Sequence, residues 1–91
     1  MEKLAGIIGR YFEKIEVAVV EMKESLAVGD TIHIIGTTSD FTQKLNVMHI
    51  ENSPVQIANR GDEVAIKVKF PVQDGDDVFF SCPEGIIHMF I

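Results

Sequence analysis

The stretch Gly61-Asp62-Glu63-Val64-Ala65-Ile66-Lys67-Val68-Lys69-Phe70 decides the fold class, because apolar side chains recur in it at every second position. A β-strand points successive side chains to opposite faces of a sheet, so this alternation predicts a strand with one buried face. The side chains predicted to face inward are Val64, Ile66, Val68 and Phe70, and those predicted to face outward are Glu63, Ala65, Lys67 and Lys69.

The composition extends this prediction to the whole chain of 91 residues. Its apolar residues include 12 Ile and 10 Val but only 3 Leu and 5 Ala. β-branched side chains lose rotamer freedom in helices and pack well on a pleated sheet, so a mostly β protein is expected. A chain this short has enough apolar residues for one core, which predicts a single domain over residues 1–91.

Other apolar segments alternate with Gly, Asp, Asn and Pro at short spacing, as in small β-barrels. A bend is expected near Val47, where the apolar pattern of its segment changes face. Closure into a barrel would remove exposed strand edges, so we expect an all-β, closed Greek-key barrel of six or seven short strands. Its core covers about residues 5–80; the further strands are expected at 7–12, 15–22, 31–35, 41–51 and 77–81, with either a short strand or a helical turn at 55–58.

The segment 81–91 is an apolar tail that needs to be covered. Residues 85–91, Gly-Ile-Ile-His-Met-Phe-Ile, contain one clearly polar side chain. They either add a strand to their own barrel or pair with a second copy of the chain, which would form a homodimer. No stretch is long and apolar enough for a membrane span, and the first residues lack a secretory signal, so a cytoplasmic location is expected.

The charge balance disfavours diffuse binding to nucleic acids. The formal net charge is −6, with 8 basic and 14 acidic residues. The basic residues are scattered along the sequence, whereas non-specific binding to phosphates needs clustered Lys and Arg. A local basic patch around Arg10 and Lys14, next to the aromatic side chain of Tyr11, stays open as an alternative.

Catalytic and metal-binding patterns are weak, and we expect no enzyme activity, cofactor or metal. Cys82 would need a histidine nearby to act as a nucleophile, and the interpretation as a small buried apolar residue is the stronger one. The three histidines match no compact ligand spacing, although His33 and His49 could lie on adjacent strands. The group Asp74, Asp76 and Asp77 lacks the downstream glutamate of a calcium loop, so a solvated turn is expected.

Three Gly-Asp elements carry a resemblance to a known family. They are Gly29-Asp30 before Thr31-Ile32-His33-Ile34, Gly61-Asp62 before Glu63 to Val68, and Gly75-Asp76 before Asp77-Val78. Together with the segment Ile8 to Val20, they resemble the β-barrel second domain of translational GTPases such as elongation factor Tu. Small translation elongation factor-like proteins and the accessory barrel of collagenase-like peptidases are similar. Glycine permits a positive φ in such turns, and the aspartate can accept backbone N–H groups there.

The resemblance implies a docking module with a macromolecular partner. The leading expectation is RNA or the ribosome, with Arg10, Tyr11, Lys14 and Lys44 as binding residues. The alternative is a protein-interaction subunit related to the barrel of collagenase-like peptidases, which suits the acidic charge better. GTP binding is not expected, because the sequence contains no Gly-x-x-x-x-Gly-Lys-Ser/Thr loop to hold phosphates. A small enzyme built on Cys82 and a histidine is the third alternative.

Overall fold

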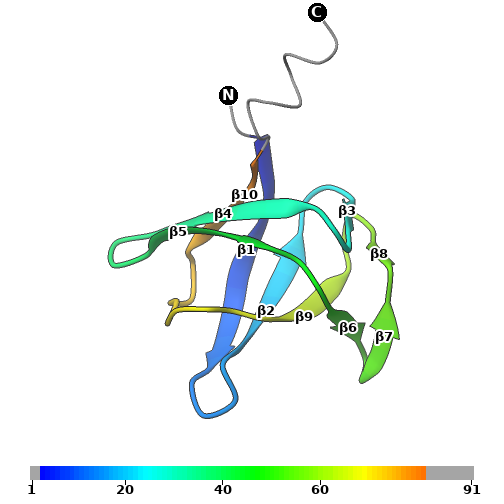
Figure 1. Ribbon diagram of the computed structural model, residues 1–91, viewed down its shortest axis with the longest axis horizontal. Helices are drawn as coiled ribbons and strands as arrows, with labels where there is room; N and C mark the ends of the chain where they lie inside the picture. The colour runs from blue at the N-terminus through cyan, green and yellow to red at the C-terminus, as the bar shows by residue number, and fades with distance from the viewer. Residues whose placement is uncertain (1–2, 82–91) are drawn as a thin grey trace, which may run out of the picture.

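The computed structural model describes residues 3–81, which form ten β-strands and no helix (Figure 1). All strand pairs in this part of the chain are antiparallel. The strands are β1 (Lys3–Phe12), β2 (Val17–Met22), β3 (Leu26–Ala27), β4 (Thr31–Ile35), β5 (Asp40–Lys44), β6 (Met48–Ile50), β7 (Ser53–Val55), β8 (Ile57–Ala58), β9 (Glu63–Lys67) and β10 (Asp77–Ser81). The all-β prediction is confirmed, whereas the predictions for Cys82 and for the tail lie outside the described residues.

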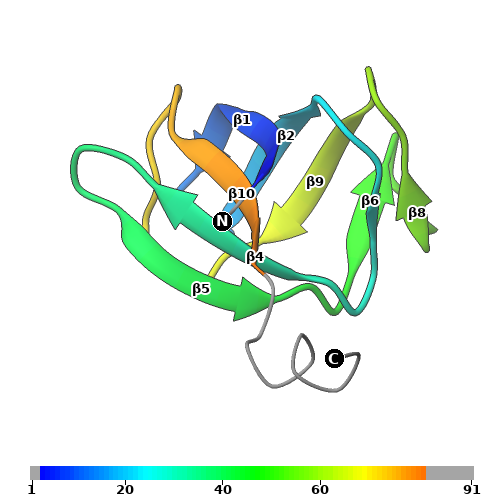
Figure 2. The same cartoon turned by 90° about the horizontal axis from the view of Figure 1, so that it is seen from above.

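Eight strands form one curled sheet in the order β5-β4-β10-β1-β2-β9-β6-β7, and β3 pairs separately with β8. The end strands of the large sheet, β5 and β7, do not pair with each other. The sheet curls so that β4 and β5 cross over β1 and β2 (Figures 1 and 2). The prediction of a closed six- or seven-stranded barrel is therefore not confirmed, because the ring of paired strands is open.

Strand β1 allows this curl because its pairing with each of its two neighbouring strands is interrupted by a register shift. It pairs with β10 and with β2, and the register shifts between Leu4 and Gly6 on one side and between Ile8 and Arg10 on the other. Such bulges bend a strand and increase its twist. Aliphatic side chains on the concave side, including Ile8, Val20 and Ile34, are almost fully buried.

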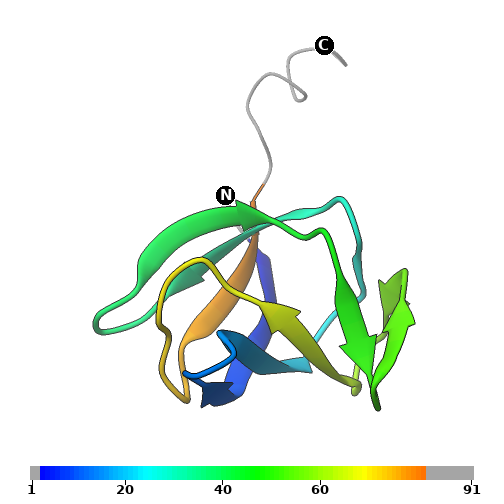
Figure 3. The same ribbon diagram turned by 60° about the horizontal axis from the view of Figure 1, so that its bottom comes forward.

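The predicted strand 41–51 is divided into β5 and β6. Strand β5 pairs with β4, while β6 pairs with β7 and β9. Between them, Leu45 is buried and Val47 is exposed, so the chain changes direction at the predicted bend (Figure 3). Residues 55–58, expected as one short strand or a helical turn, are divided between two short strands, β7 and β8. Pro54 lies within the edge strand β7, where its missing N–H costs no hydrogen bond to a further strand.

The three Gly-Asp elements form the same turn three times, as the sequence predicts. Each glycine has a positive φ, between 91° and 100°. Each aspartate carboxylate accepts the backbone N–H three residues earlier, at 2.8–2.9 Å. Each turn also binds the backbone of one buried residue, because the glycine N–H donates to that residue's carbonyl and the aspartate carbonyl accepts its N–H. The bound residues are Leu45 for Gly29-Asp30 (2.8 and 2.9 Å), Met22 for Gly61-Asp62 (2.9 and 2.9 Å) and Ile8 for Gly75-Asp76 (2.7 and 2.9 Å).

Candidate functional site

On the open side of the sheet, the end strand β5 lies near the end of the interior strand β9, and one buried side chain bridges the two. Gln43 on β5 is 6% exposed. Its amide Nε2 donates to the carbonyl of Lys67 at 2.8 Å, and its Oε1 accepts the backbone N–H of Lys69 at 2.9 Å. A neighbouring strand would make the same pair of hydrogen bonds with its backbone. The side chain of Gln43 therefore replaces a missing strand contact, and we call this junction the seam.

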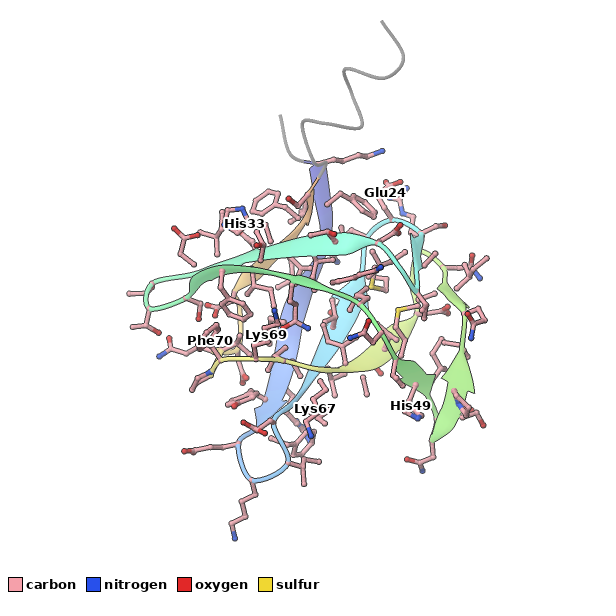
Figure 4. The ribbon with its side chains drawn as sticks, viewed as in Figure 1. Glu24, His33, His49, Lys67, Lys69 and Phe70 are labelled. Carbon is pink, nitrogen blue, oxygen red and sulfur yellow. The ribbon has the colours of Figure 1, made fainter. Side chains whose placement is uncertain are left out.

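A groove of about 650 Å³ lies along the seam. We call it the seam groove. Its lining residues come from β5, the β5–β6 connection and β6, from β9 and the residues just after it, and from the start of β2 with the residue before it. Its lining includes the basic side chains Lys44, Lys67 and Lys69, the imidazole of His49, and the apolar side chains Val17, Val47, Ala65 and Val68. In Figure 4, Lys67 and Lys69 lie beside the end of β9 and the segment after it, and His49 lies on β6.

The three lysines give the seam groove a positive charge on an acidic molecule. Within residues 3–81, none of them forms an ion pair with a carboxylate, and Glu16 is the acidic residue in the groove lining. By contrast, Lys3 pairs with Glu24 at 3.5 Å and Lys23 pairs with Glu21 at 3.0 Å. The fold thus brings Lys44 close to Lys67 and Lys69, although it is distant from them in the sequence.

The four binding residues suggested by the sequence do not form one site. Lys44 lines the seam groove, but Arg10, Tyr11 and Lys14 do not. Arg10 on β1 lies 5.9 Å from the centre of the Phe12 ring and shares a shallow hollow with Glu21 and Glu63. Tyr11 is half-buried and packs against the core, and Lys14 lies in the turn between β1 and β2. Whether any of the four binds a partner stays a prediction.

Lys67 and Lys69 were missed as site residues, although one sequence signal points to the seam. Phe41, Gln43 and Leu45 share one face by spacing, so a polar glutamine stands where an inward apolar residue is expected. A buried polar side chain needs hydrogen-bond partners, and Gln43 finds them at Lys67 and Lys69.

Phe70 does not face inward as the alternation predicts. Strand β9 ends at Lys67, and Phe70 is 55% exposed. Its ring packs edge-on against Phe41, with 5.1 Å between the ring centres. The alternation fails here because the chain leaves the strand before Pro71, which has no N–H to continue a ladder.

The histidines and Asp76 do not form a further site among the described residues. His33 on β4 and His49 on β6 do not lie on adjacent strands; His33 Nε2 instead lies 2.6 Å from Asp40 Oδ1. Asp76 is buried and caps its own turn. Within residues 3–81, no three His, Cys, Asp or Glu side chains gather as a metal site requires, and no helix is long and apolar enough to cross a membrane.

Comparison with known proteins supports the peptidase half of the resemblance. No protein-family model matches the sequence. An uncharacterized protease of Methanocaldococcus jannaschii is 35% identical over 75 residues, which are 81% of this chain and 18% of the protease. The chain therefore spans less than a fifth of the length of this relative. Neither this similarity nor those to the solved structures below involves an elongation factor.

Two crystal structures of the C-terminal domain of a protein described as a U32 peptidase, from Geobacillus thermoleovorans, have a similar fold. One superimposes with a TM-score of 0.83 at 22% identity, covering 88% of this chain and 93% of that domain. The other, a selenomethionine variant, gives a TM-score of 0.80 at 23% identity, covering 84% and 96%. At these identities the likeness establishes the fold. The described part of the chain is therefore an all-β domain with the fold of the U32 peptidase C-terminal domain.

Proposed function

We propose that this protein is a non-catalytic docking domain that serves a U32-type peptidase through protein contacts. The observation that carries the proposal is the extent of the sequence match: the 75 matched residues are 81% of this chain but only 18% of an archaeal protease. The matched part is thus a small segment of a much larger protein. The two solved domains of the same fold are C-terminal parts of a protein described as a U32 peptidase.

The surface of the described residues supports binding rather than catalysis. The seam groove offers lysine side chains, an imidazole and aliphatic side chains. A catalytic centre needs a nucleophile or base that is oriented by hydrogen bonds to a further group. The buried polar side chain of the seam groove is Gln43, and both ends of its amide are hydrogen-bonded to backbone groups. Its role is therefore structural.

RNA binding remains the competing proposal, and Lys44 is the sequence-predicted phosphate contact that supports it. Arg10 shares its hollow with Glu21 and Glu63, and these acidic residues lower the positive charge expected around Arg10 and Lys14. Reversing the charge of Arg10 and Lys14 should reduce retention on immobilised RNA if that patch is used. Unchanged retention would remove these residues from any RNA interface.

The test is co-expression of the full chain with the catalytic chain of a U32-type peptidase from the same cell. Size-exclusion chromatography after ribonuclease treatment should give a complex of the two proteins. The proposal fails if the two proteins elute separately, or if the chain is recovered with RNA and ribosomal proteins and ribonuclease releases it.

A further inference from the structure

We propose that the seam groove binds an extended acidic segment of a protein partner, in which carboxylate side chains alternate with aliphatic ones. This inference rests on the proposed function, since it names the kind of segment that the docking domain would recognise. It adds a site and a ligand chemistry that the similarity to peptidase domains does not supply.

The first argument is the charge of the groove. Lys44, Lys67 and Lys69 are exposed and, within residues 3–81, form no ion pair with a carboxylate. The lining therefore contains three lysines and one acidic residue, Glu16. On a chain with a formal net charge of −6, such a local concentration of positive charge favours an anionic ligand at this place.

The second argument is that apolar side chains accompany the lysines. Val47 is 52% exposed, and Val17 and Ala65 are half-buried. Covering these side chains with aliphatic groups of a ligand would remove apolar surface from water. An extended peptide shows alternate side chains to opposite sides, so a segment that alternates acidic and aliphatic residues can contact both kinds of lining.

The third argument concerns how the segment is recognised. The carbonyl of Lys67 and the N–H of Lys69 are already bound by Gln43, at 2.8 and 2.9 Å. An incoming strand cannot pair with these two groups unless it displaces Gln43. Recognition at the seam is therefore expected to depend on side-chain charge and apolar contact rather than on addition of a strand to β9.

The same groove is less suited to a nucleic acid. Among the described residues that line it there is no Phe, Tyr or Trp on which a base could stack. The exposed aromatic side chain nearest in sequence, Phe70, packs against Phe41 instead. The net charge of −6 also repels a long polyanion, whereas a short acidic segment meets mainly the local field of the lysines.

The experiment measures the binding of a short fluorescein-labelled peptide of alternating Glu and Val by fluorescence anisotropy. The full chain is compared with Lys44→Glu, Lys67→Glu and Lys69→Glu. Arg60→Glu is the matched control, because Arg60 is exposed, lies outside the groove lining and undergoes the same change of charge. Circular dichroism confirms that each variant is folded, which is expected because the replaced side chains are exposed.

Each groove variant should weaken binding by roughly three- to tenfold, the size expected for losing an exposed ion pair and adding a repulsion. Arg60→Glu should change affinity by less than about twofold, since its charge acts only at a distance. A peptide of alternating Lys and Val should not bind. The inference is overturned if the acidic peptide does not bind the full chain, if all four variants bind it alike, or if a single-stranded RNA of equal charge binds more tightly at the same lysines.

Failure of this inference can be separated from failure of the proposed function. If the three groove variants still form the complex with the peptidase chain as the original protein does, the docking role stands and the seam groove is not its interface. If the original chain binds the acidic peptide but no peptidase, the groove inference stands and the proposed partner is wrong.

Discussion

Replacing Gln43 by leucine should destabilise the fold, because this side chain joins β5 to the end of β9. The substitution leaves two backbone groups without partners: the carbonyl of Lys67 and the N–H of Lys69. A buried group that loses its partner costs about 1–3 kcal/mol. Because both hydrogen bonds are only partly buried, we take the lower end for each group and expect a loss of about 2 kcal/mol in total.

For a domain of this length, a loss of that size lowers the melting temperature by roughly 8–16 °C. Urea unfolding followed by far-ultraviolet circular dichroism gives the free energy of unfolding, and differential scanning calorimetry gives the melting temperature. Thr42→Val is the matched control, because it replaces an exposed polar residue on the same strand. An exposed substitution of this kind should change the free energy of unfolding by less than about 0.5 kcal/mol. If Gln43→Leu is as stable as this control, the seam does not depend on the Gln43 amide.

Five further substitutions test the turns and the core, each by urea unfolding. Gly61 has a φ of 92°. A side chain in this left-handed region is strained, so Gly61→Ala should cost about 1–2 kcal/mol. Gly9→Ala should be almost neutral, because its new methyl group meets the nearest atom at 3.7 Å. If both substitutions lower the free energy of unfolding equally, the positive φ of Gly61 is not the cause of its cost. In Gly36→Ala the new methyl group overlaps the carboxylate of buried Asp76. We expect this overlap to cost about 1–3 kcal/mol, and an unchanged midpoint would show that the contact relaxes freely. Ile66 is buried, whereas Phe70 is 55% exposed. Ile66→Ala should therefore cost about 2–5 kcal/mol. Phe70→Ala should cost less, at most about 1.5 kcal/mol; the reverse order would support the inward-facing phenylalanine that the alternation predicts.

The sequence predicts most strands because each depends on local alternation. Residues 31–35 and 77–81 form strands with the predicted bounds, and the strand after Gly61-Asp62 begins at Glu63. The Gly-Asp turns are predictable for the same reason, since their conformation needs only a glycine with positive φ and an aspartate that accepts a nearby N–H. The bend near Val47 is visible as a change of face in the apolar pattern.

Closure and the binding surface are not predictable in this way, because both depend on which distant segments meet. The argument that a small sheet avoids free edges favours a closed ring. In the structure, a side chain of β5 instead bridges the gap to β9, and the corresponding edge is left open. Lys44 and Lys67 are far apart in the sequence, so their common groove follows from the curl of the sheet rather than from their spacing.

The exposed phenylalanine shows the limit of alternation near the end of a strand. Val68 remains buried one residue beyond β9, held by a hydrogen bond from its N–H to the carbonyl of Glu16. Two residues later, Phe70 no longer lies on the sheet and packs against Phe41. The alternation in the sequence continues to Phe70, but strand β9 has already ended at Lys67. Without strand pairing, alternate side chains no longer point to the same face of the sheet.

The most direct test of the docking role at the seam groove is the reactivity of each lysine with an amine-acylating reagent, measured by mass spectrometry with and without the U32-type peptidase chain. We predict that Lys44, Lys67 and Lys69 become protected in the complex, while Lys3, Lys14 and Lys23 react as in the free protein. Equal reactivity of the three groove lysines in both states, or protection confined to the other lysines, would contradict the account.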